Sequence, residues 1–244
     1  AACLQQASAA APGSAVRLLP LVLANYLGDA ALQALILEDP GDVLGFSVFS
    51  WNLERSLFLA RRVKDRKRVR VVLGGPEVTP DNPLTRDPVV DFRTFGEGEA
   101  VFQRLLREPD FWKQGEAALD AAATFTAASS PYREGLLDPR LEDLLLLEGQ
   151  RGCPYGCAYC YYGQTRRRPV ARPIREVAAA ARWALARGVG EIYLLDPSLD
   201  TRTDLAGMLS TLASLHDGRM RWSGEIRDEA VEERLADALA AAGF

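Results

Sequence analysis

The sequence predicts an α/β protein with a parallel sheet in each half of the chain. Short apolar runs alternate with amphipathic segments of helical length along most of the 244 residues, and this alternation favours parallel strands covered by helices. Residues 108–143, rich in Ala, Thr, Ser and Pro, interrupt the alternation in a way that is typical of an interdomain linker. We therefore expect one domain over residues 1–107 and a second over residues 144–244.

The first domain is expected to begin with a disordered or frayed leader at residues 1–14. Apolar spacing over residues 16–37 predicts helix, and Gly28–Asp29 is expected to divide it into two helices. The remaining predicted elements are strands at 42–50, 69–73 and 89–95 and helices at 54–66 and 100–107.

The second domain is expected to contain three consecutive β/α units. The predicted strands and helices are 144–148, 173–187, 191–196, 203–215, 221–227 and 229–242. Such a succession predicts an incomplete barrel or half-barrel. Because the sequence stops at Phe244, just after a helix, we expect it to be a piece of a longer protein.

Composition restricts the possible functions. The chain is 48% hydrophobic and 25% charged, as soluble globular proteins are, and its net charge of −4 argues against a strongly basic nucleic-acid surface. No apolar run approaches the roughly 18–20 residues of a membrane span, and the leader lacks the charged region of a signal peptide. Three of the four cysteines lie within eight residues, which favours metal or redox chemistry in a cytoplasmic protein over a secreted disulfide framework.

The most specific motif is the cysteine loop, which contains Cys153, Cys157 and Cys160. Thiolates are the usual ligands of iron–sulfur clusters, and three of them on one [4Fe–4S] cluster would leave one iron open to a small molecule. Cys3, near the start of the chain, is a poor candidate for a fourth ligand. Structural zinc is the alternative, but zinc prefers four N/S ligands and the chain has only one histidine, His216. Buried structural cysteines are a further alternative.

The C-x3-C-x2-C spacing, with Tyr159 before the last cysteine and a predicted strand before the loop, resembles the radical S-adenosylmethionine (SAM) superfamily. The resemblance implies that the three cysteines are the metal-binding and catalytic residues. Their cluster would bind SAM, accept an electron from a donor such as flavodoxin or ferredoxin, and cleave SAM to a 5′-deoxyadenosyl radical. That radical would abstract hydrogen from a small-molecule or peptide substrate.

The resemblance also suggests further SAM contacts. Asp196 follows the second strand, where the family usually has a Gly-Gly-Glu-like segment, and either its carboxylate or nearby backbone carbonyls would meet the amino group of SAM. Glu225 and Arg227 occupy alternate positions of the third strand and therefore share a face. They form either a grip on SAM or a buried structural salt bridge. Tyr159, the aromatic residue of the motif, is expected to contact the cofactors, whereas Tyr161 and Tyr162 either pack around the cluster or belong to the core.

Three predicted strand ends in the first domain carry residues suited to a flat ligand, because glycine allows close backbone approach and Ser and Asn offer hydrogen bonds. None has the G-x-G-x-x-G dinucleotide pattern, and a glycine pair after a strand is by itself typical of a turn. The candidate residues are Ser47, Ser50, Trp51, Asn52, Gly74, Gly75, Pro76, Glu77, Gly96 and Gly98.

In this order before the cysteine loop, these strand ends resemble the cobalamin-binding domain of B12-dependent radical SAM enzymes. The resemblance implies a Rossmann-like sheet that cradles the lower face and nucleotide tail of cobalamin, followed by the first part of a radical SAM barrel. The Asp-x-His-x-x-Gly motif of other cobalamin domains is missing, since no histidine precedes His216. Cobalt would then lack a protein imidazole; loss of cobalamin binding is the alternative.

The predicted function is that of a cobalamin-dependent radical SAM enzyme, with methyl transfer from methylcobalamin to an unactivated carbon as the expected reaction. A radical cyclase or rearrangement enzyme is one alternative. A non-catalytic cobalamin- or iron–sulfur-binding protein is another, because three β/α units are fewer than the family barrel contains. We accordingly expect the chain alone not to be a competent enzyme.

Overall fold

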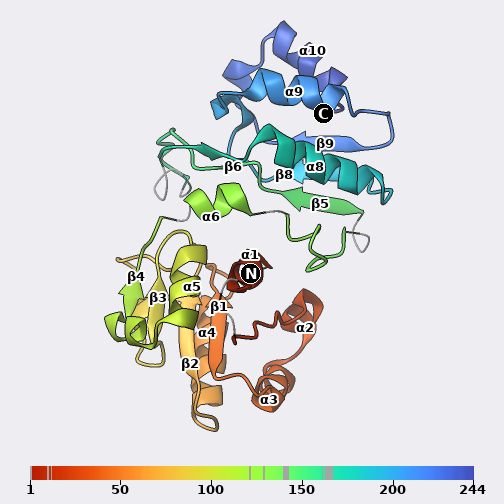
Figure 1. Cartoon of the computed structure of the whole chain (residues 1–244). Helices are drawn as coiled ribbons and strands as arrows, with labels where there is room; N and C mark the ends of the chain where they lie inside the picture. Colours follow the sequence, from red (N-terminus) through yellow and green to blue (C-terminus); the bar gives the residue numbers. More distant parts are fainter. Residues whose placement is uncertain are drawn as a thin grey trace. The chain divides into compact units, whose positions relative to one another are not determined.

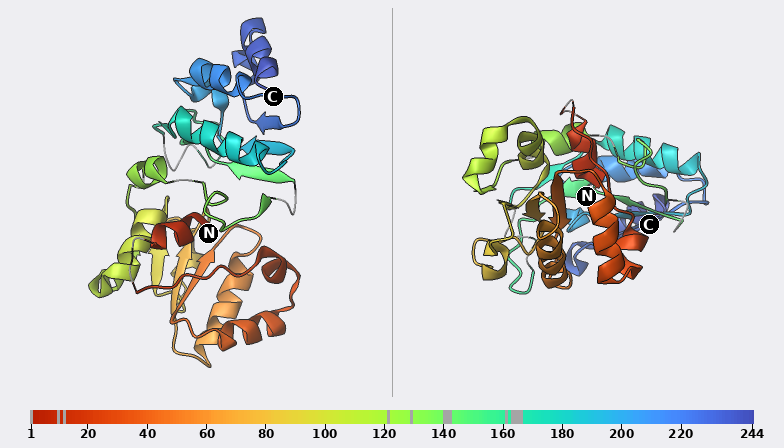
Figure 2. Two further views of the ribbon diagram at one scale, coloured as in Figure 1. Left: turned by 45° about the vertical axis from the view of Figure 1, so that its right-hand side comes forward. Right: turned by 90° about the horizontal axis from the view of Figure 1, so that it is seen from below.

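The computed structural model describes residues 2–9, 11, 13–120, 122–128, 130–139, 143–160, 162 and 167–244. The chain divides into two compact units, Ala1–Thr124 and Phe125–Phe244, and each is described here by itself (Figures 1 and 2). The domain boundaries expected from the sequence, at residues 107 and 144, stay predictions.

The first unit is a parallel sheet with helices on both faces, as the sequence predicts. Its strands lie in the order β1 (Val43–Ser47), β2 (Arg70–Gly74), β3 (Phe92–Thr94) and β4 (Glu116–Ala117), with Ser47 opposite Gly74 at the carboxyl ends of β1 and β2. Its helices are α1 (Ala2–Ser8), α2 (Leu21–Tyr26), α3 (Asp29–Glu38), α4 (Leu53–Lys64), α5 (Glu99–Arg107) and the short 3₁₀ segments η1 (Pro83–Arg86) and η2 (Pro109–Gln114).

Alternate residues of β2 enter two different cores. Val71 and Leu73 are buried together with Leu57 of α4, whereas Val72 is buried with Leu105 of α5 on the other face. This two-residue alternation is what a strand covered on both faces requires. The carboxyl ends of the strands thereby remain at one edge, where ligands of such sheets usually bind.

The expectation of a disordered leader at residues 1–14 is wrong for residues 2–8. Residues 2–8 form α1, which packs on α5: Ala2 and Ala7 are buried, and Nε2 of Gln103 donates to the carbonyl of Ala7 at 3.0 Å. Small Ala and Ser side chains give little hydrophobic periodicity, so the pattern alone does not reveal a helix that is buried through them.

Regular structure also occurs in the predicted linker. η2, β4 and α6 (Ala122–Ala127) all lie between residues 108 and 143. β4 pairs with β3, Arg93 opposite Glu116, and so extends the first sheet. A strand of two residues is too short to carry a detectable alternation of side chains.

The second unit contains three parallel strands in the order β5 (Leu144–Leu147), β8 (Glu191–Leu194) and β9 (Arg221–Gly224). The sequence predicts all three. It does not predict the short antiparallel pair β6 (Gln150–Arg151) and β7 (Val170–Ala171). The helices are α8 (Ile174–Leu185), α9 (Leu205–Ala213), α10 (Glu233–Ala241), η4 (Leu199–Thr201) and η5 (Asp228–Ala230).

The core of this unit lies on one face of its sheet. Leu145, Ile192 and Trp222, one from each strand, are buried against α8 and α9. On the opposite face Leu146 is 40% exposed and Tyr193 is half-buried. This one-sided cover fits the wall of a partial β/α barrel, whose other face lines the interior.

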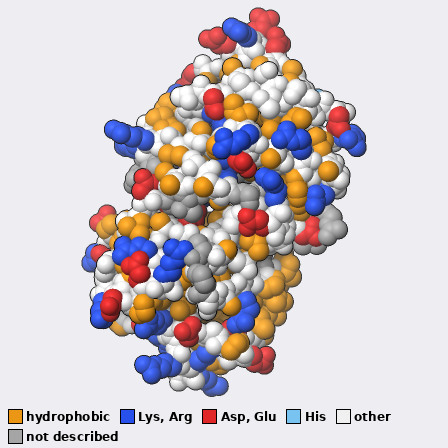
Figure 3. Space-filling model, viewed as in Figure 1, with side chains coloured by type: hydrophobic (Ala, Val, Ile, Leu, Met, Phe, Trp, Pro, Cys, Tyr) orange, Lys and Arg blue, Asp and Glu red, His pale blue; other side chains and the backbone are white. Residues whose placement is uncertain are grey.

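The surface carries charges of both signs. On the face that Figure 3 shows, basic and acidic side chains are interspersed. In the described part of the chain, no helix has the length and apolar character needed to cross a membrane.

Candidate functional site

The cysteine loop leaves the carboxyl end of the second unit's first strand. After β5 the chain passes through β6 and then runs without helix or strand from Gly152 to Cys157. β6 pairs with β7, with Arg151 opposite Val170, so the two ends of the loop are joined at its base. Tyr161 lies outside the described residues, as do 163–166.

The three cysteines of the loop differ in exposure. Cys153 is buried, Cys157 is exposed and Cys160 is half-buried, and all are free thiols. The backbone N–H of Cys160 donates to the carbonyl of Cys157 at 3.1 Å. Among the described residues, no group of three or more His, Cys, Asp or Glu side chains is gathered to hold a metal ion. The donor set itself fits an iron–sulfur cluster, because three soft thiols share one loop; their ligation of a cluster stays a prediction.

Tyr155, between the first two cysteines, ties the loop to the ends of the other strands. Its hydroxyl donates to Oδ2 of Asp200 at 2.7 Å, and the guanidinium of Arg227 lies 4.1 Å from the centre of its ring. The hydrogen bond to Asp200 raises the pKa of Tyr155. Sequence reasoning missed Tyr155 and Asp200, which are 45 positions apart.

Glu225 and Arg227 have separate partners among the described contacts. Arg227 forms an ion pair with Glu229 at 2.8 Å, whereas Glu225 accepts a hydrogen bond from the hydroxyl of Tyr193. The alternative of a salt bridge between Glu225 and Arg227 is therefore not among them. Their predicted place on the third strand is wrong, because β9 ends at Gly224. Their roles as SAM contacts stay predictions.

Tyr159 is 93% exposed beside the second cysteine. The Cys157 sulfur raises the pKa of Tyr159, through its charge and through a hydrogen bond. Tyr162 is 36% exposed, and burial raises its pKa to about 12. Core packing therefore does not explain Tyr159, whereas the position of Tyr162 at the cluster rim stays a prediction.

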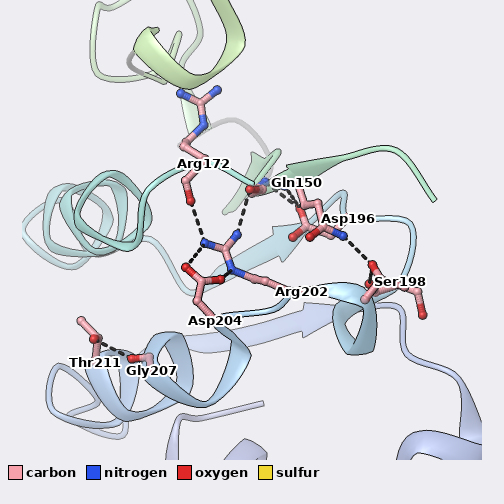
Figure 4. A network of polar contacts seen from close by, with 10 residues as sticks. Gln150, Arg172, Asp196, Ser198, Arg202, Asp204, Gly207 and Thr211 are labelled. Carbon is pink, nitrogen blue, oxygen red and sulfur yellow. Dashed lines mark hydrogen bonds and ion pairs between the residues drawn. The ribbon is translucent and has the colours of Figure 1, made fainter. Parts of the chain in front are cut away.

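Asp196 follows β8 and points at the base of the cysteine loop (Figure 4). It is 1% exposed, and its Oδ1 accepts the backbone N–H groups of Gly149 and Gln150 at 2.6 and 2.8 Å. Burial raises the pKa of Asp196 to about 6, against the opposing effect of these two hydrogen bonds. The sequence marks Asp196 as a candidate, but not the backbone groups that it contacts.

In the first unit, the loops after β1 and β2 are joined by backbone hydrogen bonds. The N–H of Val48 donates to the carbonyl of Gly74 at 2.7 Å, and the N–H of Glu77 donates to the carbonyl of Val48 at 3.3 Å. Gly75 has φ +109°, and a Cβ there would lie 2.6 Å from the Val48 carbonyl oxygen. The close approach of the two loops therefore requires glycine at this position.

The β1 loop presents a stacked aromatic pair, in which Trp51 is exposed and Phe49 is half-buried. Trp51 is 78% exposed and stacks on Phe49, with ring centres 4.6 Å apart and planes 11° apart. Asn52 organises the loop, since its Oδ1 accepts the N–H of Phe49 at 2.7 Å and its Nδ2 donates to the carbonyl of Ser47 at 3.1 Å. The amide of Asn52 is thus engaged within the protein, whereas Ser47 and Ser50 are exposed.

The remaining candidates lie at the same edge of the sheet. Pro76 is exposed, and Oε2 of Glu77 accepts from Nδ2 of Asn82 at 3.2 Å. Gly96 follows β3 with open space where a Cβ would stand, and Gly98 precedes the first turn of α5. This edge thus offers open backbone at Gly96 and the exposed ring of Trp51, which fits a large planar ligand such as a corrin.

Family profiles match both units. The profile described as B12 binding domain matches residues 3–106, and that of the Radical SAM superfamily matches residues 147–244. Together the two matches include the ends of β1, β2 and β3 and the cysteine loop.

Curated relatives match about half of the chain. The sequence is 37% identical over 156 residues to 2-(S-pantetheinyl)-carbapenam-3-carboxylate methyltransferase of Streptantibioticus cattleyicolor, covering 52% of this chain and 23% of that protein. It is 35% identical over 151 residues to the cobalamin-dependent radical SAM methyltransferase TokK of Streptomyces tokunonensis, covering 50% of this chain and 22% of TokK. The chain thus aligns with less than a quarter of the length of each.

A solved structure supports the fold. The radical SAM methyltransferase TsrM from Kitasatospora setae, determined with cobalamin and a [4Fe–4S] cluster bound, superposes with a TM-score of 0.72 at 17% identity. The match covers 99% of this chain and 54% of TsrM. The predicted fold class, a B12-binding α/β domain before a radical SAM domain, is confirmed. The chain thus carries a region that matches the B12 binding domain, followed by a region that matches the Radical SAM superfamily, and these domains imply cobalamin, SAM and a [4Fe–4S] cluster as cofactors.

Proposed function

We propose that this chain supplies the cofactor-binding part of a cobalamin-dependent radical SAM methyltransferase. The observation that carries the proposal is the C-x3-C-x2-C loop at the carboxyl end of β5, in one chain with a parallel sheet whose β1–β3 ends form an open, glycine-rich edge. Bound together, the cofactors supply an electron, a 5′-deoxyadenosyl radical and a methyl group.

Cys153, Cys157 and Cys160 are the proposed cluster ligands. We assign the contact with SAM to the residues around them, because Tyr159 is exposed beside Cys157 and the positive charge of Arg227 lies over Tyr155 in the same loop. The guanidinium suits the carboxylate of SAM. Glu225, two residues away, is the proposed partner for the ribose.

The β1–β3 loops are the proposed seat of cobalamin. Trp51 offers its ring to the corrin, while Ser47 and Ser50 offer hydroxyls to its amide side chains. Asn52 acts indirectly, since its side chain already holds the loop. Gly96 gives the ligand access to the backbone, since the space at its Cβ position is open. Gly74 and Gly75 let the β1 and β2 loops approach each other, Gly98 lies against Leu4, and Pro76 and Glu77 border the proposed site.

Methyl transfer to an unactivated carbon of a small molecule or peptide is the proposed reaction. Its support is that both curated relatives named above are methyltransferases, at 37% and 35% identity. The reductant is proposed to be a small electron-transfer protein such as flavodoxin or ferredoxin.

The test is anaerobic reconstitution of the full chain with iron, sulfide and hydroxocobalamin, followed by metal analysis and ultraviolet–visible spectroscopy. We expect about four irons per chain together with bound corrin. Cys153→Ala, Cys157→Ala and Cys160→Ala should each remove the iron and leave the corrin bound. Trp51→Ala should weaken corrin binding and leave the iron content unchanged.

Cys3→Ala is the matched control, because Cys3 lies on α1 in the first unit and outside the cysteine loop. It should keep its full iron content. Bound zinc, or iron that survives all three loop substitutions, would contradict the proposed function. Cluster without corrin would limit the proposal to an ordinary radical SAM protein.

A further inference from the structure

The backbone at the base of the cysteine loop is held on its N–H side by a single buried carboxylate. Oδ1 of Asp196 accepts from both Gly149 and Gln150, at 2.6 and 2.8 Å. Asp196 belongs to the segment after β8, and the residues that it holds lie between β5 and the first cysteine. The neighbouring strand end therefore fixes the point from which the loop departs.

The carbonyl side is held by a buried arginine. The Arg202 side chain is fully buried; its Nη1 donates to the carbonyl of Gly149 at 2.9 Å and its Nη2 to the carbonyl of Arg172 at 2.6 Å. Its Nε lies 2.7 Å from Oδ1 of Asp204, so the buried charge is paired (Figure 4). Arg172 stands where the chain returns from the loop, just after β7. One guanidinium thus joins the outgoing and returning strands.

Gly149 has no side chain because the carboxylate occupies the place of one. A Cβ at position 149 would lie 2.9 Å from Oδ2 and 3.1 Å from Oδ1 of Asp196. The φ angle of Gly149 is not positive, so space rather than backbone conformation accounts for the glycine. Gly149, Asp196 and Arg202 form one device, which we call the loop clamp.

The clamp uses one oxygen of Asp196. Within the described part of the chain, the other oxygen, Oδ2, is buried and has no hydrogen-bond partner. An asparagine can therefore place its carbonyl oxygen at Oδ1 and keep both hydrogen bonds. A group that bound the ammonium of SAM would instead need its negative charge and an exposed oxygen. The 1% exposure of Asp196 disfavours that role.

On the basis of the function proposed above, we infer that Asp196 is a positioning residue that fixes the cysteine loop through the backbone of Gly149 and Gln150, and that it is not a ligand of SAM. Arg202 completes the clamp from the carbonyl side. The placement of the cluster thereby depends on a side chain that touches neither the cysteines nor SAM.

The experiment compares Asp196→Asn, Asp196→Ala and Gly149→Ala in the full chain. The readouts are iron content after reconstitution, the electron paramagnetic resonance spectrum of the reduced cluster with and without SAM, and hydrogen exchange of peptides spanning 149–160. Asp196→Asn should match the unsubstituted chain in all three. The two alanine variants should lose at least half of the iron, and their loop amides should exchange about tenfold faster.

Gly190→Ala is the matched control. Its Cβ would meet a carboxylate in the same way, 2.5 Å from Oδ2 of Asp143, but at the amino end of the same two strands. It should disturb packing locally and leave the iron content, the spectrum and the exchange of residues 149–160 unchanged.

The outcomes separate the clamp from the proposed function. If Asp196→Asn keeps its iron but its spectrum no longer responds to SAM, Asp196 is a SAM ligand and the inference is wrong, even if the alanine variants do not fold. Alanine variants with full iron and unchanged exchange would also overturn it. If the unsubstituted chain takes up no cluster, the proposed function fails, and hydrogen exchange alone then decides the clamp.

Discussion

The two sheets arrange their carboxyl edges by different means. In the first unit, neutral backbone hydrogen bonds and glycine join the β1 and β2 loops and leave Trp51 in the open. In the second unit, buried charged groups, Asp196 and Arg202, hold the cysteine loop by its backbone. The difference is consistent with the ligands proposed: a broad flat molecule needs an open surface, whereas a small cluster needs three thiols brought to one point.

The largest expected effect on stability follows removal of the buried arginine. Arg202→Ala deprives the Arg172 carbonyl and the partly exposed Asp204 carboxylate of their contacts with the guanidinium, while the Gly149 carbonyl keeps the backbone N–H of Arg172 at 2.7 Å. We expect a loss of about 3–5 kcal/mol in the free energy of unfolding. Urea denaturation monitored by circular dichroism measures it. Arg219→Ala, which removes an exposed ion pair with Asp217, is the control and should cause little change. Similar losses in the two variants would mean that burial of Arg202 adds nothing.

In the first unit, the corresponding loss of stability comes from a steric clash at Gly75. Gly75→Ala places a Cβ 2.6 Å from the Val48 carbonyl oxygen at a positive φ, and we expect a loss of about 3 kcal/mol and a separation of the β1 and β2 loops. Gly96→Ala is the matched control, since Gly96 also has a positive φ but open space around it. It should lose only about 1 kcal/mol, from the backbone conformation. Equal losses, measured by urea denaturation, would show that the contact with Val48 is unimportant.

Titration of Asp196 is expected to change the free energy of unfolding by a smaller amount, which depends on pH. Burial raises its pKa from 3.8 to about 6, despite the amides of Gly149 and Gln150 and the charge of Arg202; Glu148 acts in the same direction as burial. Because the folded state holds this proton more tightly than the unfolded state, stability is lost as pH rises from about 4 through 6. A shift of about two units corresponds to roughly 3 kcal/mol at most.

Asp196→Asn cannot ionise, so its stability relative to the unsubstituted chain should improve across the same pH range. Urea denaturation of both proteins at pH 4, 5, 6 and 7 gives this difference directly. A difference that stays constant with pH would mean that the carboxyl titrates with its ordinary pKa.

The sequence predicts those features that depend on residues close together along the chain. These local patterns include the cysteine spacing, the strands that end in Gly74 and Thr94, and the break at Gly28 between two helices. The clamp joins residues 47 positions apart, and Tyr155 reaches Asp200 across 45. The spacing of hydrophobic residues along the chain cannot predict contacts between residues so far apart in sequence. Helix α1 was missed for a different reason, because it is buried through alanines that carry little hydrophobic signal.

The smallest expected effect on stability is that of Trp51→Ala, which tests ligand binding in the first unit without disturbing its folding. Trp51 is 78% exposed, so Trp51→Ala should change the free energy of unfolding by less than about 0.5 kcal/mol. Phe92→Ala, at a fully buried position of the same sheet, should lose about 3–5 kcal/mol. If the open edge exists to receive corrin, Trp51→Ala should nevertheless retain less hydroxocobalamin after gel filtration. Full retention with unchanged affinity would mean that the exposed Trp51 ring is not part of the cobalamin site. The two strand edges would then differ only in how their backbone is held.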